Sequence, residues 1–555
     1  MTKSALQIAR AAYKPKVPKT LEGIVTIREG QPTQSVSNQG AIKKLFPNTY
    51  GMPVITFESG TEKIQYPPVN VGVILSGGQA PGGHNVIAGI FDGIKNMNPA
   101  SRLYGFILGP GGLIDHKYME LTVDIIDEYR NTGGFDIIGS GRTKLETVEQ
   151  FEKGLVILKQ LNITSLVIIG GDDSNTNACV LAEYYAQKGA GVKVIGCPKT
   201  IDGDLKNDWI ETSFGFDTAC KVYSEVIGNI QRDCNSARKY WHFIKLMGRS
   251  ASHIALECAL QVQPNICLIS EEIEAKNLSL DDVVQYIANI VAKRAENGNH
   301  FGTVLIPEGL IEFIPAMKKL IHELSDYLAN HEEEFKRIKR SHQLVHIIDN
   351  LSPENAKIFE SLPENVARQL TLDRDPHGNV QVSMIDTEKL LAEMVGNRLA
   401  EMSLDGKYKG KFASQVHFFG YEGRCAAPSN YDADYCYSLG FTAAGLVAFG
   451  KTGYMSSVRN TTAPASEWIA GGVPITMMMN MEQRHGHQKP VIQKALVNLD
   501  GAPFKAFAAN RDTWAVNTDY VYPGPIQYFG PTEVCDQPTI TLQIEQEDLR
   551  QQANK

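Results

Sequence analysis

Short apolar runs alternate with longer amphipathic stretches along most of this chain. Residues 69–76, 165–169 and 192–196 are such runs, rich in Val, Ile and Leu, and each is followed by a loop that contains glycine. Runs of this length are typical of strands buried on both faces, whereas residues 148–161 have the length and spacing of a helix. The alternation of strands and helices predicts an α/β fold with a mostly parallel sheet.

The pattern continues beyond Phe216, near which we expect a second α/β region to begin. It predicts further strands at residues 102–108, 135–138, 241–246, 264–269, 301–306 and 416–420. It also predicts a helix that ends near Ile94 and another at residues 280–296. Residues 310–406 are richer in charge and contain several prolines, which indicates an inserted helical subdomain.

Composition narrows the classes of function. The chain has 555 residues, enough for two or more domains, and its net charge of −8 argues against nucleic acid as a partner. Nine cysteines are scattered without a Cys-x-x-Cys pair, so we expect a reducing, cytoplasmic location rather than a disulfide scaffold. The first residues lack the apolar core of a signal peptide, and no apolar run has membrane-spanning length, so we expect no membrane partner.

Charged residues gather where two of the predicted strands end. Asp172 and Asp173 follow the second apolar run named above, and Lys199, Asp202 and Asp204 follow the third. In open α/β sheets, ligands bind at this carboxyl edge. Carboxylates beside glycine loops repel phosphate unless a metal intervenes. The combination therefore predicts Mg²⁺-assisted phosphoryl transfer, with one carboxylate left as a base.

Two of these carboxylates have a plainer alternative role. Asp172 is a candidate Mg²⁺ ligand, but it could instead cap the following helix, as Ser174 or Asn175 could. Asp202 is the candidate general base, but residues 202–204 would also suit a tight turn. Three carboxylates around one loop are costly without a cation, which favours the functional interpretation.

Glycine and arginine residues indicate where phosphate would be bound. The loop at Gly77 and Gly78 joins a strand to a helix, so its N–H groups could cradle a phosphate, although a tight turn is the alternative. Arg142, Arg249 and Arg424 each end a glycine-containing segment after an apolar run. A surface ion pair would explain any one of them, but three at equivalent strand ends favour a ring of phosphate ligands.

The order of these motifs resembles that of the phosphofructokinase family. Over about residues 70–425 the shared motifs are Gly77-Gly78-x-Ala80-Pro81-Gly82, Gly139-Ser140-x-Arg142, Gly170-Gly171-Asp172, Thr200-Ile201-Asp202, Met247-Gly248-Arg249, Pro307-Glu308-Gly309 and Tyr421-x-x-Arg424. Residues 471–474 and 489–495 resemble the long, pyrophosphate-dependent branch. The resemblance implies two Rossmann-like three-layer α/β domains with an N-terminal extension and a helical insertion.

The resemblance also implies a division of the chain into parts. We expect an N-terminal extension at 1–69, a diphosphate-binding α/β domain at 70–215 and about 425–480, a sugar-phosphate-binding α/β domain at 216–309, about 407–424 and 481–515, the helical insertion at 310–406, and a C-terminal segment at 516–555.

Roles for single residues follow from the same resemblance. Asp202 would deprotonate the 1-hydroxyl of fructose 6-phosphate, and Asp172 and Asp204 would bind Mg²⁺. The further catalytic residues would be Asp173, Lys199 and Arg249. The diphosphate ligands would be Gly78, Arg142, Asp173 and Lys199. The sugar-phosphate ligands would be Thr200, Ile201, Asp202, Lys239, Tyr240, Met247, Gly248, Arg249, Glu308, Tyr421, Glu422, Gly423 and Arg424. Lys239 and Tyr240 match positions that reach a neighbouring subunit, which implies a homodimer with shared active sites.

Two positions bear on the phosphoryl donor. ATP-using relatives carry glycine where this chain has Asp173 and where it has Lys199. A carboxylate at 173 would repel the α-phosphate of ATP by charge and bulk, whereas pyrophosphate ends before that point. Lys199 adds positive charge at the reacting phosphates, which is useful for a donor without adenosine. Both positions favour pyrophosphate.

The expected reaction is the transfer of a phosphoryl group from diphosphate to fructose 6-phosphate, in glycolysis or gluconeogenesis. Because diphosphate and fructose 1,6-bisphosphate have comparable phosphoryl-transfer potential, the reaction would be reversible. The alternatives are an ATP-dependent 6-phosphofructokinase, activity on sedoheptulose 7-phosphate, and a noncatalytic regulatory subunit.

Overall fold

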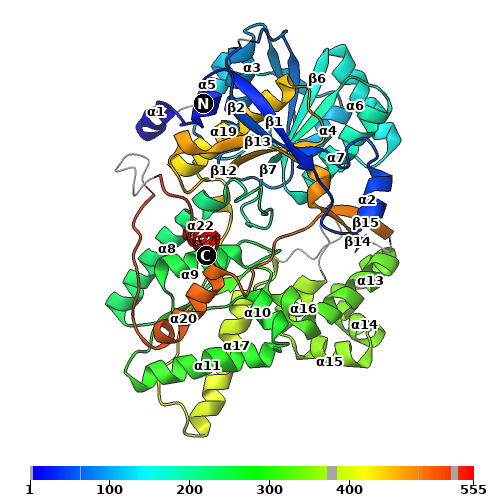
Figure 1. Cartoon of the computed structure of the whole chain (residues 1–555). Coiled ribbons are helices and arrows are strands. Elements are labelled where there is room, and N and C mark those ends of the chain that lie inside the picture. Colours follow the sequence, from blue (N-terminus) through cyan, green and yellow to red (C-terminus); the bar gives the residue numbers. More distant parts are fainter. Residues whose placement is uncertain (1–3, 63, 372–383, 485–486, 527–535, 555) are drawn as a thin grey trace. The chain divides into compact units, whose positions relative to one another are not determined.

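A computed structural model describes residues 4–62, 64–371, 384–484, 487–526 and 536–554 (Figure 1). Contacts divide the chain into two compact units. Unit 1 comprises Met1–Ala219, Tyr421–Ala495 and Ile526–Gln546, and unit 2 comprises Cys220–Gly420, Leu496–Pro525 and Glu547–Lys555. Within the described ranges, none of the helices is long and apolar enough to cross a membrane.

Unit 1 is built on a nine-stranded sheet with the order β1-β2-β13-β12-β7-β6-β3-β4-β5. These strands are β1 (Val25–Pro32), β2 (Pro53–Ser59), β3 (Asn70–Leu75), β4 (Arg102–Phe106), β5 (Tyr118–Glu120), β6 (Ile163–Gly170), β7 (Lys193–Pro198), β12 (Tyr454–Arg459) and β13 (Ile469–Pro474). The strands from β12 to β4 run parallel, and the edges on both sides are antiparallel. A separate hairpin consists of β14 (Met479–Arg484) and β15 (His487–Ile492).

Helices cover both faces of this sheet, so its central strands are almost fully buried, as expected for parallel strands rich in Val and Ile. The helices of unit 1 are α1 (Ala5–Ala11), α2 (Gln39–Leu45), α3 (Gly83–Met97), α4 (Pro110–Ile114), α5 (Val123–Tyr129), α6 (Val148–Gln160), α7 (Asp172–Gln187), α18 (Tyr421–Arg424) and α19 (Asn430–Ala448). Figure 1 shows α6 and α7 on one side of the sheet and α3 and α19 on the other.

The N-terminal part is joined into this sheet rather than merely packed on it. β2 pairs with β13 through Gly471 and Gly472, and β1 adds an outer antiparallel strand. The buried carboxylate of Glu183, on α7, accepts hydrogen bonds from the backbone N–H groups of Asn48 and Thr49 and from both of their side chains. The segment is therefore tied to the helix that begins at Asp172.

Unit 2 contains a four-stranded parallel sheet with the order β11-β8-β10-β9. Its strands are β8 (Trp241–Leu246), β9 (Ile266–Cys267), β10 (Gly302–Pro307) and β11 (Ser414–Phe419). Its helices are α9 (His253–Val262), α10 (Ser270–Ala275), α11 (Leu280–Glu296), α12 (Leu310–Phe313), α13 (Pro315–Arg337), α14 (Gln343–Asn350), α15 (Pro353–Ser361), α16 (Glu364–Leu370), α17 (Thr387–Leu404) and α20 (Ala502–Val516). Helices α8 (Phe216–Ala237) and α22 (Ile540–Ala553) have residues in both units.

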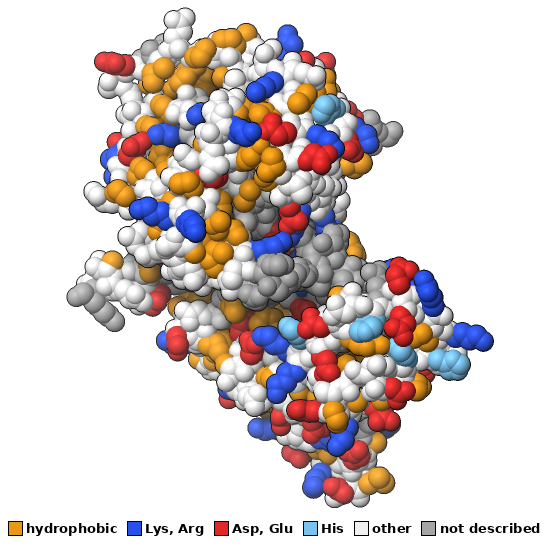
Figure 2. Space-filling model, turned by 90° about the vertical axis from the view of Figure 1, so that its right-hand side faces the viewer, with side chains coloured by type: hydrophobic (Ala, Val, Ile, Leu, Met, Phe, Trp, Pro, Cys, Tyr) orange, Lys and Arg blue, Asp and Glu red, His pale blue; other side chains and the backbone are white. Residues whose placement is uncertain are grey.

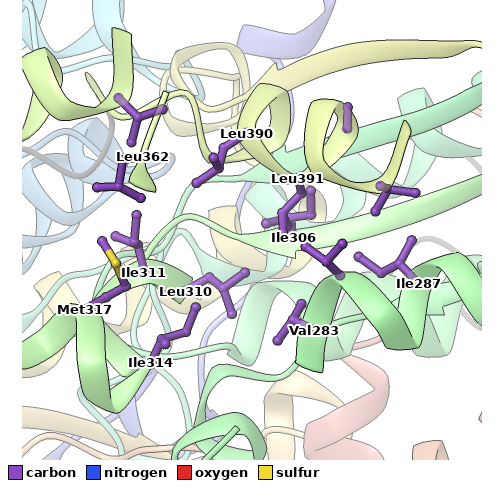
Figure 3. Packing of buried hydrophobic residues seen from close by; sticks show 14 of the residues in the cluster. Val283, Ile287, Ile306, Leu310, Ile311, Ile314, Met317, Leu362, Leu390 and Leu391 are labelled. Carbon is purple, nitrogen blue, oxygen red and sulfur yellow. The ribbon is translucent and has the colours of Figure 1, made fainter. Parts of the chain in front are cut away.

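The residues expected to form a helical insertion share one hydrophobic core with this sheet. Figure 3 shows Ile306 of β10 among side chains from α11, α12, α13 and α17, including Leu310, Met317 and Leu391. The described part of residues 310–406 is helical as expected, and its burial against β10 makes it part of the unit-2 core.

Most expected strands are present, but one is wrong. Residues 135–138 form turns, because Gly139 N–H bonds back to Phe135 O and closes the segment on itself. The run is apolar because Phe135, Ile137 and Ile138 are buried, and burial alone does not make a strand. The strand expected at 264–269 is limited to the two residues of β9.

Candidate active site

The carboxyl ends of three neighbouring strands of unit 1 bring the predicted residues together. Gly170 at the end of β6 lies opposite Pro198 at the end of β7, and Lys199 N–H donates to Gly170 O at 3.0 Å. Ser76, just after β3, donates its N–H to Ile169 O at 2.8 Å. The loops after β3, β6 and β7 therefore start side by side at one edge of the sheet, as the sequence predicts.

The glycine loop after β3 keeps its backbone open towards a lysine. Gly77 has φ of 83°, a conformation that favours glycine, and its N–H donates to Gly141 O at 2.9 Å. A Cβ atom on Gly77 would lie 3.4 Å from Lys199 Nζ. The loop and the lysine thus lie next to each other, although Gly77 and Lys199 are 122 positions apart in sequence.

Two arginines lie beside the next residue of this loop. A Cβ atom on Gly78 would be 3.4 Å from Arg424 Nη1 and 3.9 Å from Arg142 Nη2. The Arg424 guanidinium also lies over the ring of Tyr421, 4.8 Å from its centre. Positive charge beside an open glycine backbone is suited to binding a phosphate group. Arg424, predicted as a sugar-phosphate ligand, therefore lies at the predicted diphosphate loop.

Helix α7 places Asp172 and Asp173 in its first turn. The N-cap is Gly171, with no side-chain cap, so the alternative role of Asp172 as the cap is wrong. Asn175 is not the cap either, because its side-chain amide donates to Gly170 O, Gly171 O and Cys197 O. Both carboxylates are partly exposed at the helix start, where negative charge is favoured.

Lys199 is a buried cation in this group, 6% exposed. Burial lowers the pKa of its ammonium group to about 8. The nearby charges of Arg424 and Arg142 act in the same direction, whereas those of Asp202 and Asp172 oppose it. The lysine therefore holds a positive charge near neutral pH only against a desolvation cost, which an incoming anion would offset.

The loop after β7 fixes the candidate base. Asp202 N–H donates to Thr200 Oγ1 at 3.1 Å, and Thr200 O accepts from the Ser213 hydroxyl at 2.9 Å. The Asp202 side chain is partly exposed, while that of Ile201 is buried and leaves its backbone for any ligand contact. This arrangement combines the expected turn with an accessible carboxylate.

Asp204 and a lysine that sequence reasoning did not assign complete the group. Burial, with the charges of Asp202 and Asp172, raises the pKa of the Asp204 carboxyl to about 7. Lys494 Nζ lies 3.7 Å from Asp172 Oδ2 and 4.0 Å from Asp204 Oδ2. Lys494 lies in the stretch 489–495, whose expected resemblance to the pyrophosphate-dependent branch does not indicate where the lysine side chain lies.

Unit 2 holds the predicted sugar-phosphate residues that follow β8 and β10. The Glu308 carboxylate accepts a hydrogen bond from Gly248 N–H at 2.8 Å, and Gly248 has φ of 130°. A Cβ atom on Gly309 would collide with Arg249 O at 2.1 Å. The Glu308 side chain therefore orients the loop of Met247, Gly248 and Arg249, a positioning role that its place in the motif did not indicate.

Lys239 and Tyr240 precede β8 at an exposed turn. Tyr240 has φ of 65° and is 38% exposed, and Lys239 is also exposed. Tyr421 and Glu422 of α18 are exposed as well, whereas Gly423 is buried. Lys239, Tyr240 and Tyr421 are thus accessible at the surface.

The sequence and the fold are similar to those of known proteins. Residues 70–357 match the family described as Phosphofructokinase. The chain is 67% identical over 548 residues to the pyrophosphate--fructose 6-phosphate 1-phosphotransferase of Porphyromonas gingivalis, with 99% of this chain and 100% of that protein covered. It is 55% identical over 558 residues to a protein of the same name from Treponema pallidum, with 98% and 97% covered. The chain belongs to the phosphofructokinase family.

A solved structure agrees in fold. The pyrophosphate-dependent phosphofructokinase from Nitrosospira multiformis is similar over 74% of this chain and 84% of its own, with a TM-score of 0.50 and 17% sequence identity. At this identity the likeness concerns the fold alone. The family and the α/β fold expected from the sequence are confirmed.

Proposed function

We propose that this chain catalyses the reversible, Mg²⁺-dependent transfer of a phosphoryl group from diphosphate to the 1-hydroxyl of fructose 6-phosphate, which yields fructose 1,6-bisphosphate and phosphate. The observation that carries the proposal is buried Lys199 beside Gly77, with the carboxylates of Asp172 and Asp202 around it. The names of the relatives that match the whole chain support the same reaction.

Diphosphate binding is proposed for the cationic side of this group. Gly78 offers backbone without a side chain, with the charge of Arg142 beside it and that of Lys199 beside the preceding Gly77. Asp173, in the first turn of α7, would exclude the longer phosphate chain of ATP. When the phosphoryl group is transferred, the departing phosphate carries negative charge in the diphosphate-binding part of the site, and a charged Lys199 stabilises that charge.

Asp202 is proposed as the general base. As the 1-hydroxyl oxygen bonds to phosphorus, its proton passes to the Asp202 carboxylate, and the bond to the departing phosphate breaks. In the reverse direction the same carboxyl returns the proton. Its partial exposure and its fixed backbone suit both steps.

Asp172 and Asp204 are proposed to hold Mg²⁺. Within the described ranges, no group of three or more His, Cys, Asp or Glu side chains could bind a metal ion. Mg²⁺ commonly binds through one or two carboxylates together with phosphate oxygens and water, so two suffice. Burial, together with the charges of Asp202 and Asp172, raises the pKa of the Asp204 carboxyl, and Lys494 lies within 4.0 Å of both Asp172 and Asp204, which supports a cation at this place. Bound Mg²⁺ would offset charge on the phosphate oxygens.

Sugar-phosphate binding, the dimer and the division into parts stay proposals. The sugar ligands are those expected from the sequence, with the Glu308 carboxylate accepting a hydrogen bond from Gly248 N–H. Lys239 and Tyr240 are proposed to reach a partner's site in a homodimer.

The two units defined by contacts have boundaries at Ala219 and Ala495, which differ from the boundaries expected from the sequence. We keep the expected division as the proposed functional division of the chain. A cytoplasmic location also stays a prediction.

The test is phosphorylation of fructose 6-phosphate with Mg²⁺, with diphosphate and ATP compared in parallel. Activity with diphosphate alone is expected. Activity with ATP alone would contradict the roles of Asp173 and Lys199. Inactivity with both donors would favour sedoheptulose 7-phosphate, which is tested in the same assay, or a noncatalytic subunit.

A further inference from the structure

The side chain of Asn175 joins the ends of two neighbouring strands in unit 1. Its amide nitrogen donates to Gly170 O at 2.6 Å and to Gly171 O at 2.9 Å, at the end of β6, and to Cys197 O at 3.2 Å, on β7. The residue is fully buried. One side chain of α7 is therefore bonded both to the strand that precedes its own helix and to the next strand of the sheet.

The backbone of β7 leaves room for this side chain. A Cβ atom on Gly196 would lie 2.0 Å from Asn175 Oδ1, so only a residue without a side chain can stand at this position. Both Gly196 and Cys197 are buried. The first turn of α7 thus interlocks with β7, since the amide nitrogen bonds to the strand and the amide oxygen lies against it.

The elements that Asn175 joins carry groups proposed for catalysis. Asp172 begins α7, three positions before Asn175, and Lys199 directly follows β7. Lys199 N–H donates to Gly170 O at 3.0 Å, and the Asn175 amide donates to the same carbonyl. The separation between the carboxylate of Asp172 and the ammonium group of Lys199 therefore depends on one buried carboxamide.

We infer that Asn175 is a positioning residue for phosphoryl transfer, which sets the spacing between the proposed ligands at the start of α7 and Lys199 after β7. The inference rests on the proposed function. Because Asn175 is fully buried, it acts through the backbone carbonyls of Gly170 and Cys197 and not by contact with a substrate. A buried amide with several partners holds such a spacing closely, since a shift of the helix weakens its bonds to one strand or the other.

The inference requires a specific kinetic change. Without the carboxamide, α7 can shift against β7, so kcat should fall and KM for diphosphate should rise. The proposed sugar-phosphate residues after β8 and β10 belong to unit 2, so KM for fructose 6-phosphate should stay near that of the wild type. A residue that only stabilised the fold would change the fraction of active protein, which lowers kcat and leaves both KM values unchanged.

The experiment compares the full-length protein with Asn175→Ser. A serine hydroxyl can bond to Gly171 O, one turn back in the same helix, but its side chain is shorter and should not reach Cys197 O. We expect kcat/KM for diphosphate to fall roughly 10- to 100-fold. Inorganic diphosphate is also titrated at saturating Mg²⁺ by calorimetry, and its affinity should fall at unchanged stoichiometry. Thermal unfolding checks that the variant is folded, and Asn175→Asp, of the same size, is the second variant if it is not.

Gly196→Ala disturbs the same contact from the other strand. The added methyl group takes the space of Asn175 Oδ1, so this variant should also weaken diphosphate binding although residue 175 is unchanged. Unchanged diphosphate affinity in folded Gly196→Ala would contradict the inference.

Asn70 provides a matched control. It lies at the amino end of β3, and its side-chain amide donates to Leu161 O at 2.7 Å. Asn70→Ser therefore removes the same kind of bond at the opposite edge of the same sheet. Neither KM value should change in this control.

Unchanged diphosphate affinity in folded Asn175→Ser would overturn the inference, as would an equal loss of affinity for fructose 6-phosphate. Lower stoichiometry at unchanged affinity would show that the role of Asn175 is structural only. The titration needs no turnover, so its outcome is separate from the proposed function. Wild-type protein that fails to phosphorylate fructose 6-phosphate with diphosphate would refute the function, whereas active wild type with unchanged diphosphate affinity in the variant would refute the inference alone.

Discussion

Lys199 carries a charge that its burial disfavours, so its protonation state should depend on pH within the range of an activity assay. With the pKa lowered to about 8 by burial, the free enzyme holds a charged lysine below that pH and a neutral one above it. We therefore expect kcat/KM for diphosphate to fall as the pH rises through about 8, because this parameter reports the free enzyme.

The matched variant is Lys199→Arg, whose guanidinium stays charged over the same range. Its kcat/KM is expected to be lower than that of the wild type because the geometry differs, but its profile should lack the decline near pH 8. An identical decline in both proteins would show that another group titrates.

The Asp202 carboxylate should matter for chemistry and little for binding. We expect Asp202→Ala or Asp202→Ser to lower kcat by roughly 100- to 10,000-fold, the usual effect of removing a general base. Affinities for diphosphate and fructose 6-phosphate, measured by calorimetry, should change little. Near-normal turnover in either variant would contradict the assignment of Asp202 as the general base.

Asp173 should govern the choice of donor. Asp173→Gly removes the carboxylate from the first turn of α7, so repulsion of the ATP α-phosphate should decrease and ATP-dependent phosphorylation should appear. The measurement is the ratio of kcat/KM for ATP and for diphosphate. If ATP remains unused even after Lys199→Gly is added, donor choice lies elsewhere in the chain.

Single residues were predictable from the sequence where a strand end marks their place. Asp172 and Lys199 follow β6 and β7, and the parallel register of these strands brings them to one edge. Lys494 was not predictable, because it follows a hairpin and lies 290 positions beyond Asp204 in sequence. Its neighbours Ile492 and Ala495 hold it at this edge through hydrogen bonds to Thr176 and Asp204. A local pattern carries no information about such a contact.

At the scale of elements, glycines set how closely α3 and α19 pack. A Cβ atom on Gly89 would lie 2.2 Å from Tyr437 O, and one on Gly440 would lie 2.0 Å from Val86 O. The two helices therefore touch through their backbones, and this contact leaves no room for a methyl group.

We expect Gly89→Ala to lower the free energy of unfolding by about 1–3 kcal/mol or more, because the helices must move apart. Gly40→Ala is the matched control, since Gly40 lies in helix α2 and a Cβ atom on it would have no neighbour within 4 Å. It should be neutral or stabilise by up to about 1 kcal/mol. Chemical denaturation measures both, and equal effects would contradict the packing argument.

Elements with a strong pattern were predicted within a few residues. The run at 241–246 is β8, and residues 280–296 are α11, which a Ser279 capping box begins. The run at 135–138 failed because its burial comes from tertiary contacts and its hydrogen bonds close a turn. Apolar content without a partner strand is ambiguous over so short a run.

At the scale of the whole molecule, the charged helices of unit 2 have a solvated outer surface. Figure 2 shows acidic and basic side chains interspersed over the lower, helical part of that face. The ion pairs of unit 2 include Lys318 with Glu274, Arg368 with Glu364 and Arg398 with Asp281. Such pairs add little stability each, so the shared core around Ile306 is what holds these helices.

The sequence could not show how the expected insertion and extension are integrated. Charge and proline content marked residues 310–406 as a separate subdomain, yet Leu310 and Leu391 pack with Ile306 of the sheet. Likewise β2 joins the unit-1 sheet through β13, a pairing between residues more than 400 positions apart. Pairing between strands that are far apart in sequence depends on the completed fold, so the local periodicity of the sequence does not predict it.

The proposed homodimer can be tested by mixing two inactive proteins. Lys239 is exposed before β8, and if it serves the partner's site, Asp202→Ala and Lys239→Ala damage complementary halves of a shared site. A mixed dimer then has one intact site, and random exchange makes half of the dimers mixed, so roughly a quarter of wild-type activity should return.

Each variant alone should stay nearly inactive, and size-exclusion chromatography with differently tagged chains should verify that subunits have exchanged. Two variants at one position, Asp202→Ala and Asp202→Ser, form the control mixture and should recover no activity, because neither chain supplies a base. Absence of recovery after verified exchange in the first mixture would place Lys239 outside the partner's site. Recovery would show that a complete site needs residues from two copies of this chain.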